Sequence, residues 1–428
     1  MIYKIIYKIG ERIRNPSLKI KYDFLKASEK WTLEELERYQ FIKLKELLEN
    51  AKKHSPYYKV KLKNINITEF KSLLDLKKIP VTTKQELFES RNLIQTALNF
   101  KKVITARTSG TDGKSLVFKR EEAADSFNRA SIQRGYSWYG INYWDKNGYF
   151  WGLNFSYFQK YKSRVLDALQ NRFRIFSFEE KKLKRFVIKL KKAKYVHGYS
   201  SMIYQTALLI NASNLQRPSN IKMVKGTSEK IFDGYQEEVI KAFGTKIISE
   251  YGATESGIIA FECPFGNMHI NMEGVLVEEI ENEIVVTNLQ MHSFPIIRYK
   301  LGDYIKLSTS RKKCKCGLEH KILEEVTGRI GENIYGYHKV YPSLYVYYIF
   351  KNLSIAYNIH LNYQVIQKEK GELVFLIGQN INILEESQLI KEIKHYFDQD
   401  IKFFIKKGAI FNVQKKNKIK NFISKVND

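Results

Sequence analysis

Strand-like runs alternate with helical patterns between about residue 99 and residue 257. The strand-like runs are residues 149–152, 195–201 (a strand and its turn), 221–225 and 246–250, and the helical patterns are residues 179–194, 203–210 and 231–243. Parallel strands need a long crossover connection, which is usually a helix. The alternation therefore predicts an α/β core with a mostly parallel sheet covered by helices.

Polar turns follow three of these strands. They are Tyr199-Ser200-Ser201, Gly226-Thr-Ser-Glu229 and the segment from Tyr251 to Ser256. Ligands of open α/β sheets bind in a crevice outside the carboxyl ends of the strands. The three turns therefore predict one shared binding site.

A glycine-rich segment, residues 108–115, reads Thr-Ser-Gly-Thr-Asp-Gly-Lys-Ser. Glycines let the backbone approach a polyanion, hydroxyls add hydrogen-bond donors, and Lys114 adds a positive charge. The segment differs from the pattern G-x-x-x-x-G-K-[ST] because Thr108 replaces the first glycine. We predict a loop that holds phosphate and precedes a strand at residues 116–118; a polar surface hairpin is the alternative.

The flanking regions have other patterns. Helical spacing predicts helices over residues 18–62, among them residues 33–47, and Ser55-Pro56 ends this unit. Residues 80–86 predict a turn into another helix, capped by Thr82 or Thr83. Strands are expected near residues 275–280, 283–287, 304–307, 361–367, 372–377 and 402–412, and helices near residues 343–352 and 385–397.

These patterns divide the chain into two domains. The large domain is expected to span residues 1–328, with a helical part (1–98), an α/β core (99–257) and a β-barrel-like antiparallel unit (258–327). The segment Thr327-Gly328-Arg329 breaks the strand pattern, so we place the boundary at residues 328–332. A small α+β domain, residues 329–428, follows.

Composition limits the classes of protein and of partner. A chain of 428 residues with 44% apolar residues and 7 prolines is expected to be globular, with two to three folded units. The formal net charge of +27 attracts polyanions such as nucleic acid, anionic lipid or phosphorylated small molecules; a lysine-rich composition with solvated side chains is the alternative. No RNA-binding or helix-turn-helix pattern is present, so nucleic acid is not an expected partner.

The sequence also bears on location. Three cysteines are too few for a disulfide framework and fit a reducing compartment. No apolar run approaches ~18 residues, the length of a membrane-spanning helix. Residues 1–9 are too short and too charged for a signal peptide, and we expect a packed helix there rather than an amphipathic surface anchor. We predict a cytoplasmic protein; association with the inner face of the membrane and homodimerisation are left open.

Three segments together resemble a known superfamily. Residues 108–115, 251–256 and 298–303 are similar in order and content to the core motifs of the adenylate-forming (AMP-binding) enzymes, which activate a carboxylic acid with ATP. Residues 51–58, 79–84, 295–303 and 314–317, followed by Gly328-Arg329, resemble the phenylacetate–CoA ligase-like branch, which includes the CapK proteins of capsule loci. The resemblance covers nearly the whole chain and implies a small, mobile C-terminal domain that rotates about a hinge.

The resemblance implies a role for each matching residue. The residues implied to bind ATP are Thr108, Ser109, Gly110, Thr111, Gly113 and Lys114 at the β- and γ-phosphates, Gly226, Thr227 and Ser228 at the adenine, and Tyr251, Gly252, Asp303 and Arg329. Tyr251 would stack on the adenine, Asp303 would accept both ribose hydroxyls, and Arg329 begins the hinge. Thr254 would contact the α-phosphate and Glu255 would bind Mg²⁺.

A lysine near the C-terminus completes the implied catalytic set. Lys418 would contact the α-phosphate and the attacking carboxylate, with Lys416 and Lys420 as alternatives. The family's glycine before this lysine is Asn417 here. Of the acidic pair expected after the hinge, one position is Gly331 and only Glu332 remains. The implied reaction gives acyl-AMP and pyrophosphate, after which coenzyme A or another acceptor takes the acyl group.

Four further residues have metal-binding chemistry. Cys263, His269, Cys314 and Cys316 could supply three thiolates and an imidazole, which is a tetrahedral Zn²⁺ set. The C-x-C spacing is tighter than the usual C-x₂₋₄-C, although relatives carry a similar arrangement and some bind zinc. Buried cysteines with a core or surface histidine are the alternative.

The pocket for the acid is expected by position around Tyr149, Trp151, His197 and Tyr199, although aromatic runs are more often core. We therefore predict an acid–thiol ligase that uses ATP and Mg²⁺, with a carboxylic acid and CoA or another acceptor as partners, in surface-polysaccharide (capsule or O-antigen) synthesis. One alternative is an aryl–CoA ligase of aromatic acid metabolism. Another is a catalytically reduced nucleotide-binding partner in polysaccharide assembly.

Overall fold

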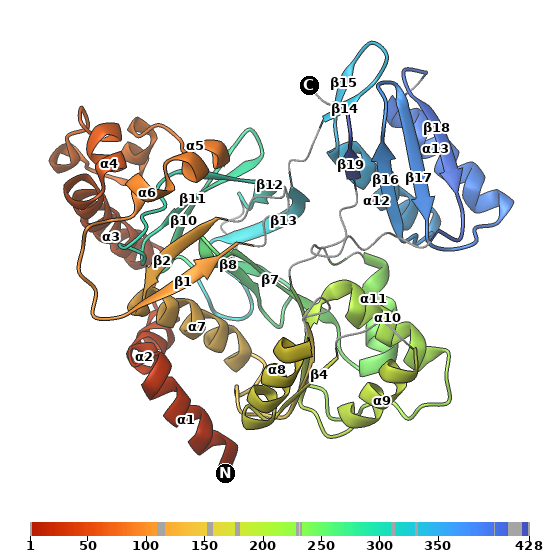
Figure 1. The fold of residues 1–428 in the computed structure, drawn as a ribbon, viewed down its shortest axis with the longest axis horizontal. Helices are drawn as coiled ribbons and strands as arrows, with labels where there is room; N and C mark the ends of the chain where they lie inside the picture. The colour runs from red at the N-terminus through yellow and green to blue at the C-terminus, as the bar shows by residue number, and fades with distance from the viewer. Residues whose placement is uncertain are drawn as a thin grey trace.

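An 11-stranded mixed sheet forms the centre of the computed structural model, in the order β10-β11-β12-β13-β9-β8-β7-β6-β5-β3-β4 (Figure 1). The structure describes residues 2–108, 116–151, 157–175, 180–227, 231, 233–309, 313–329, 333–397, 399–409 and 422–426. The parallel half consists of β3 (Asn147–Phe150), β4 (Arg172–Ile175), β5 (Tyr195–Tyr199), β6 (Met223–Thr227) and β7 (Ile247–Ala253). The α/β core predicted from the alternating pattern is therefore confirmed.

The antiparallel half continues the same sheet from β7. Its strands are β8 (Gly257–Glu262), β9 (Met268–Ile270), β10 (Val275–Ile280), β11 (Glu283–Asn288), β12 (Tyr299–Leu307) and β13 (Ile322–Arg329). Strand β7 pairs parallel to β6 along its first half and antiparallel to β8 along its second half. Thr327, Gly328 and Arg329 lie within β13, because this strand follows β12 as far as Asp303, so the expected break in the strand pattern is wrong.

Helices cover both faces of the parallel half. The helices are α7 (Glu122–Ser137), α8 (Tyr157–Leu169), α9 (Glu180–Leu190), α10 (Ser200–Asn211) and α11 (Asp233–Phe243). Val196 and Val224 pack in one apolar cluster with α9, α10 and α11, whereas their neighbours Tyr195 and Met223 pack on the other face with Tyr136 of α7. This alternation follows from the two-residue period of side chains along a strand.

Several boundaries differ from the sequence prediction. Strand β3 begins two residues before the predicted Tyr149. Helix α10 begins at Ser200, three residues before its predicted start at Ile203. Helix α9 ends at Leu190, four residues before its predicted end at Lys194. Strand β7 runs through Ala253, so the first three residues of the segment 251–256 belong to the strand rather than to the turn after it.

The first hundred residues form a helical layer. Its elements are α1 (Ile2–Arg14), α2 (Leu18–Ser28), α3 (Leu33–His54), α4 (Pro56–Lys61), the 3₁₀ helices η1 (Ile67–Glu69) and η2 (Leu73–Lys78), α5 (Lys84–Glu89) and α6 (Arg91–Ile94). Ser55 caps α4, with Pro56 at its first position, so the predicted break after α3 is confirmed. A capping box of Thr83 and Glu86 starts α5, which decides between the two predicted caps, while Thr82 is buried and donates to the carbonyl of Ile297.

A hairpin and a second sheet complete the structure. The hairpin pairs β1 (Val103–Arg107) with β2 (Val117–Glu121). The C-terminal elements are β14 (Asn333–Tyr335), β15 (Val340–Pro342), α12 (Leu344–Tyr357), β16 (Tyr363–Gln367), β17 (Glu372–Ile377), α13 (Ile383–Phe397), β18 (Lys402–Lys406) and β19 (Phe422–Ser424). Strands β16–β19 form a four-stranded sheet that packs on α12 and α13 around its own apolar core.

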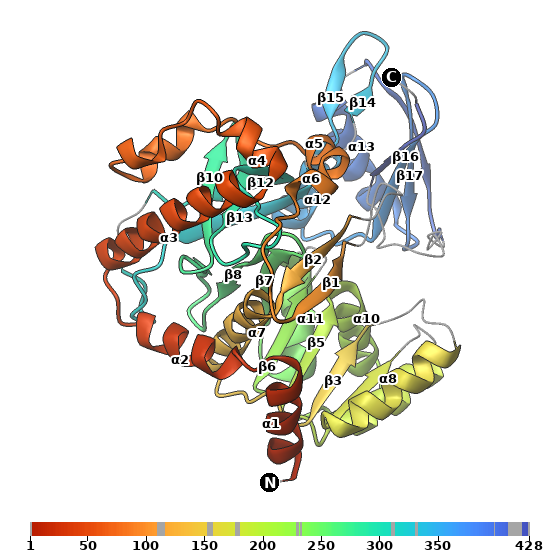
Figure 2. The same ribbon diagram turned by 60° about the vertical axis from the view of Figure 1, so that its left-hand side comes forward.

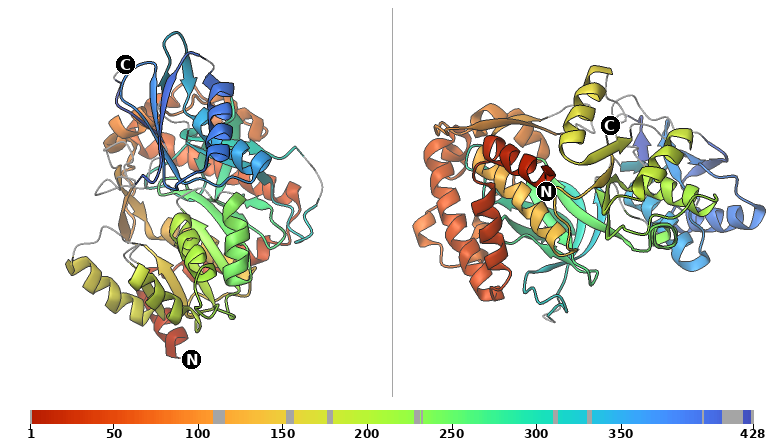
Figure 3. Two further views of the ribbon diagram at one scale, coloured as in Figure 1. Left: turned by 90° about the vertical axis from the view of Figure 1, so that its right-hand side faces the viewer. Right: turned by 90° about the horizontal axis from the view of Figure 1, so that it is seen from below.

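The C-terminal sheet and the first helix lie at opposite ends of the molecule (Figure 3). Helix α11 contacts α12, and Gly234 of α11 approaches His360 so closely that a Cβ at Gly234 would lie 2.3 Å from the imidazole Nδ1. Among the described helices, none has the length and apolar character needed to cross a membrane.

Candidate active site

The turn between β7 and β8 is held in place from three sides. The Arg120 guanidinium donates to the carbonyl of Thr254 at 3.2 Å, and the Asn288 amide donates to the carbonyl of Ser256 at 3.0 Å. The Tyr299 hydroxyl lies 3.5 Å from the carboxylate of Glu255, which is largely buried. Side chains from β2 and β11 therefore fix the backbone of this turn, and a side chain from β12 approaches its carboxylate.

Gly252 and Gly257 allow this turn to be tight. A Cβ at Gly252 would lie 2.5 Å from the carbonyl oxygen of Gly257. Gly257 itself has φ = +79°, and a Cβ there would lie 2.3 Å from the amide oxygen of Asn128. Only glycine satisfies both conditions without moving the backbone.

A hydrogen bond joins two strands that are not neighbours in the sheet. The Tyr251 hydroxyl of β7 donates to the Asp303 carboxylate of β12 at 2.7 Å. In the β12–β13 register, Asp303 is opposite Arg329. Tyr299, on the same strand as Asp303, approaches Glu255. The predicted residues Tyr251, Glu255 and Asp303 therefore lie in one region.

The end of β6 joins this region through a buried ion pair. Lys225 forms an ion pair with Glu250 of β7 at 2.7 Å, and both side chains are almost fully buried. The Thr227 hydroxyl lies 3.5 Å from the same carboxylate. Gly226 packs closely against α10, because a Cβ there would lie 2.5 Å from the hydroxyl of Ser200.

The glycine-rich segment connects the two strands of the β1–β2 hairpin. At its base, the Thr108 backbone N–H donates to the carbonyl of Leu116 at 3.0 Å, and the Leu116 N–H donates to the Thr108 hydroxyl at 2.9 Å. Arg120 of β2 links this hairpin to the carbonyl of Thr254, as described above. The hairpin and the β7–β8 turn are therefore directly connected.

Part of the predicted site lies outside the described residues. These positions are Ser109, Gly110, Thr111, Gly113, Lys114, Ser228, Gly331, Glu332, Lys416, Asn417, Lys418 and Lys420. Their roles remain predictions.

Four stacked rings form an aromatic ladder: Tyr149 on β3, Trp151 directly after β3, and His197 and Tyr199 on β5. Tyr149 stacks on His197 with ring centroids 4.2 Å apart, and Trp151 stacks on Tyr199 at 4.5 Å. Tyr149 and Trp151 are also nearly parallel, at 5.9 Å. The parallel register places Tyr149 opposite His197, and positions two residues apart share one face of a sheet. The structure therefore brings the four predicted acid-pocket residues together.

His197 is neutral in this environment. Burial lowers its pKa well below the usual value, and the positive charges of Arg172, Lys225 and Arg174 lower it further. Its Nε2 lies 3.3 Å from the amide oxygen of Asn147. The guanidinium groups of Arg172 and Arg174 lie 4.8 and 4.7 Å from the ring of Tyr149, so cations surround the ladder.

The predicted metal ligands form a second cluster at the other end of β8. The ligand atoms of Cys263, His269, Cys314 and Cys316 all lie within 4.8 Å of one another. The Sγ atoms of Cys263 and Cys314 are 3.7 Å apart, and Cys316 Sγ is 3.2 Å from His269 Nε2. Two tight turns supply the cysteines, with Gly266 N–H bonded to the Cys263 carbonyl and Gly317 N–H bonded to the Cys314 carbonyl.

The histidine of this cluster has the protonation that metal binding requires. Burial lowers the pKa of His269 to about 4, so the ring is neutral at neutral pH. His269 Nδ1 donates to the carbonyl of His320 at 3.2 Å, which leaves Nε2 directed at Cys316.

Sequence reasoning missed the polar residues that support the site. Arg120, Glu250 and Tyr299 each contact a predicted residue. Arg120 follows the predicted strand at residues 116–118 by two positions, and Tyr299 lies inside the recognised segment 295–303. The position of each residue in the sequence could therefore have marked it as a candidate for the site. No pattern singled out Glu250 as the partner of Lys225, because that pair depends on the β6–β7 register.

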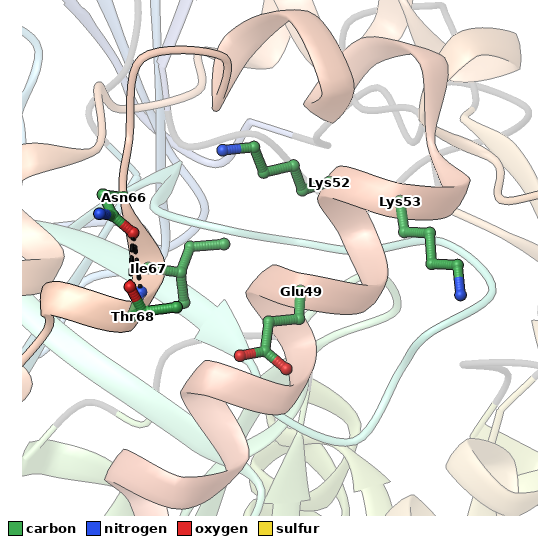
Figure 4. A pocket seen from close by; sticks show the side chains of 6 residues that line it. All are labelled: Glu49, Lys52, Lys53, Asn66, Ile67 and Thr68. Atoms are coloured by element: carbon green, nitrogen blue, oxygen red, sulfur yellow. Dashed lines mark hydrogen bonds between the residues drawn. The ribbon is translucent and has the colours of Figure 1, made fainter.

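A surface pocket of about 310 Å³ lies elsewhere, between α3 and η1 (Figure 4). Its lining residues are Glu49, Lys52, Lys53, Asn66, Ile67 and Thr68. Within it the Asn66 side chain accepts a hydrogen bond from the Thr68 N–H at 3.2 Å. It includes none of the predicted site residues.

Comparison with known proteins gives one sequence relative and a set of similar structures. No protein-family model matches the chain. Protein CapK of Staphylococcus aureus is 24% identical over 286 residues, a match that covers 64% of this chain and 63% of CapK. The match therefore spans less than two thirds of the length of that relative.

Structures of 2-hydroxyisobutyryl-CoA ligase are among the similar solved structures. In the postadenylation state with R3-HIB-AMP, it superposes with a TM-score of 0.70 at 16% identity, covering 92% of this chain and 91% of the ligase. In the thioesterification state with 2-HIB-AMP and CoA, the TM-score is 0.58 over 93% and 91% of the two chains. The whole chain therefore resembles the first state more closely than the second.

Proposed function

We propose that this chain, whose fold is that of the adenylate-forming ligases, activates a carboxylic acid with ATP to give an acyl-AMP and pyrophosphate. The observation that carries the proposal is the junction of β7, β8 and β12, where Tyr251 binds Asp303 and Tyr299 approaches Glu255. Arg120 joins the glycine-rich hairpin to the same turn. A nucleotide bound there would contact segments from four distant parts of the sequence.

In this proposal ATP extends from β6 to the hairpin. The adenine would lie beside Gly226, Thr227 and Ser228 and stack on Tyr251, next to Gly252. Asp303 would accept hydrogen bonds from the ribose hydroxyls, since a carboxylate can accept two donors at once. The phosphates would lie against Thr254 and the hairpin loop of Thr108, Ser109, Gly110, Thr111, Gly113 and Lys114, and Arg329 would begin the hinge.

The proposed chemistry is an in-line displacement at the α-phosphorus. A carboxylate oxygen of the acid forms the new P–O bond, and the bond to pyrophosphate breaks with both electrons leaving on oxygen. Lys418 would place its positive charge at the α-phosphate oxygens, where negative charge increases in the transition state. Glu255 would hold Mg²⁺, which when bound neutralises phosphate charge.

The aromatic ladder supports a pocket for the acid next to this site. Tyr149, Trp151, His197 and Tyr199 present flat rings at the carboxyl ends of β3 and β5. Because His197 is neutral, it would act as a hydrogen-bond partner of the acid rather than as a counter-charge. An aromatic lining is compatible with an aromatic acid, which supports the alternative of an aryl–CoA ligase.

The acceptor and the biological setting belong to the same proposal. Coenzyme A or another thiol would take the acyl group, in keeping with the CoA bound to 2-hydroxyisobutyryl-CoA ligase. The likeness to CapK supports a place in surface-polysaccharide synthesis. The three cysteines are free thiols, which fits a cytoplasmic protein.

We also propose that the cysteine–histidine cluster holds a structural Zn²⁺. In a tetrahedral site with Zn–S near 2.3 Å and Zn–N near 2.1 Å, neighbouring ligand atoms are about 3.5–3.8 Å apart. The separation of 3.7 Å between the sulfurs of Cys263 and Cys314 fits this geometry, and the 3.2 Å between Cys316 Sγ and His269 Nε2 is slightly shorter. All four positions are filled by protein atoms, which is typical of structural rather than catalytic zinc.

The test is ATP–pyrophosphate exchange with a panel of aromatic, branched aliphatic and amino acids. We expect exchange with at least one acid, and Glu255→Gln to reduce it by roughly 10²–10³-fold, the usual effect of losing a charge-stabilising group. Glu324→Gln, at an exposed position of β13, is the control and should keep wild-type exchange. ATP binding without exchange for any acid would favour the nucleotide-binding partner with reduced catalysis, to which Asn417 and Gly331 also point.

A further inference from the structure

Helix α1 turns its apolar side chains toward solvent. Ile2, Ile5, Ile9 and Ile13 are 52–72% exposed, and no residue of the helix is buried. Their spacing of three and four residues places them along one side of the helix. We call these four residues the α1 stripe.

The side of α1 that contacts the rest of the protein is polar and aromatic. The Gln133 amide of α7 donates to the Tyr7 hydroxyl and to the Glu11 carboxylate, both at 3.0 Å. The Tyr7 ring also lies 5.7 Å from Tyr143. A surface helix normally packs its apolar side inward and exposes its polar side. Helix α1 has the reverse orientation, so its stripe is not explained by packing within this chain.

Helix α8 has the same reversed orientation. Four of its exposed apolar side chains again follow a spacing of three and four residues, and we call Phe158, Tyr161, Val165 and Leu169 the α8 stripe. Leu166 of the same helix is exposed as well. Among the side chains of α8 that the structure describes, Asp167 is the buried one, and it forms an ion pair with Arg174 of β4 at 2.8 Å. A buried carboxylate therefore fixes α8 to the sheet and directs the apolar residues outward.

The two helices contact one another and lie at the end of the molecule opposite the C-terminal sheet (Figure 1, Figure 2). Exposed basic residues on the two helices include Arg12 and Arg14 on α1 and Lys162 and Arg164 on α8. Lys4 and Lys8 lie 5.5 and 5.8 Å from the Trp144 ring, on the side of α1 that faces the protein. Each helix has only one acidic residue, and both are paired, Glu11 with Lys8 and Asp167 with Arg174. The surface around the stripes is therefore strongly cationic.

We propose that the α1 and α8 stripes bind the surface of an anionic lipid bilayer. Interfacial helices insert an apolar side to the boundary between headgroups and acyl chains, while lysine and arginine interact with anionic headgroups. Long basic side chains can extend to the phosphates while their stems cover apolar surface. A second copy of this chain is a poorer occupant, because two surfaces of a protein with net charge +27 would repel each other.

With the two stripes on a bilayer, the C-terminal sheet would lie at the end of the molecule away from the membrane (Figure 3). The inference does not depend on the proposed chemistry, since it rests only on the exposure, orientation and charge of α1 and α8.

The experiment is co-sedimentation of the full chain with vesicles. We expect binding to vesicles of phosphatidylglycerol and phosphatidylcholine, and little binding to vesicles of phosphatidylcholine alone. Replacing two α1-stripe residues (Ile5→Ser with Ile9→Ser) should weaken binding by at least about tenfold, because each inserted isoleucine contributes a transfer free energy. The charge reversal Lys162→Glu with Arg164→Glu should reduce binding and its sensitivity to salt.

The control replaces two apolar residues elsewhere that are more exposed than Ile5 and Ile9, which are 52% and 53% exposed. Val60 and Leu74 are 76% and 72% exposed in the helical layer, and Val60→Ser with Leu74→Ser should leave vesicle binding unchanged. All variants should keep the wild-type melting temperature and ATP–pyrophosphate exchange, which separates this test from that of the proposed function. Equal binding to both vesicle types, undiminished binding of the stripe variants, or a wild-type dimer that the stripe variants convert to monomer would each overturn the proposal.

Discussion

Asp125 connects the glycine-rich hairpin to the body of the protein. Its buried carboxylate, on the first turn of α7, forms ion pairs with Arg120 at 2.5 Å and with Arg129 at 2.8 Å. The Asn15 amide donates to the same carboxylate at 2.9 Å. Arg120 in turn donates to the carbonyl of Thr254. The change Asp125→Asn keeps the shape of the side chain but removes the charge that holds Arg120.

The size of the effect follows from the pKa of Asp125. Burial alone would raise this pKa, but the charges of Arg129 and Arg120 and the Asn15 amide lower it from 3.8 to about 2. Since a factor of ten in an equilibrium constant is worth about 1.4 kcal/mol, the charged form contributes about 2 kcal/mol to the free energy of unfolding at pH 7. This contribution is present above the unfolded-state pKa and is lost as the pH falls from about 4 to 2.

Urea unfolding followed by tryptophan fluorescence measures this quantity. All four tryptophans precede residue 152, so the signal reports on the part of the chain that contains Asp125. We expect Asp125→Asn to cost about 2 kcal/mol at pH 7 and roughly half as much at pH 3. The control Asp23→Asn removes an exposed ion pair with Lys19 and should cost less than about 0.5 kcal/mol. A cost that stays constant or grows on acidification would refute the reasoning.

Two further predictions concern the metal cluster and the β7–β8 turn. Cys314→Ser should abolish zinc in elemental analysis and lower the melting temperature by more than about 5 °C. A chelator should lower the melting temperature of the wild type but not that of the variant. Wild-type protein that contains no zinc would contradict the proposed metal site. Gly252→Ala should reduce ATP–pyrophosphate exchange and destabilise the protein by roughly 1–3 kcal/mol, because the new methyl group would lie 2.5 Å from the carbonyl of Gly257. Gly10→Ala on exposed α1 is the control, because a Cβ at Gly10 would have no atom within 4 Å. This change should leave stability unchanged or raise it by up to about 1 kcal/mol. Equal losses of stability in the two variants would rule out the steric explanation.

Local patterns were sufficient to predict many of the regular elements of this fold, although α7, α8 and β4 were missed. Strand β17 was expected at residues 372–377 and spans Glu372–Ile377, because a short apolar run, Leu-Val-Phe-Leu-Ile, is bounded by glycines. The cap of α5 was narrowed to two threonines, and Thr83 is the one whose hydroxyl accepts from the Glu86 N–H. Signals of this kind depend only on neighbouring residues, so they can be read from one sequence.

Long-range polar contacts could not be predicted in the same way. Glu273 is completely buried and accepts from Arg134 at 2.6 Å and from His320 at 2.9 Å, although nothing in its local sequence distinguishes it from a surface carboxylate. Burial alone would raise the pKa of Glu273, but Arg134 and His320 hold it well below the usual range. The orientation of α1 was missed for a related reason. The sequence shows that this helix is amphipathic, but only its contact with Gln133 shows which side faces the protein.

The metal cluster and the candidate active site lie at opposite ends of the same strands. Strand β8 begins at Gly257, next to the turn with Thr254 and Glu255, and Cys263 follows its last residue. Strand β13 begins at Ile322, shortly after Cys314 and Cys316, and ends opposite Asp303. Strand β9 lies between them and carries His269. A metal bound by the four side chains would therefore lock the register of β8, β9 and β13, and through them the separation between the β7–β8 turn and Asp303. A cluster that positions the site in this way should affect stability and nucleotide affinity more than the chemical step.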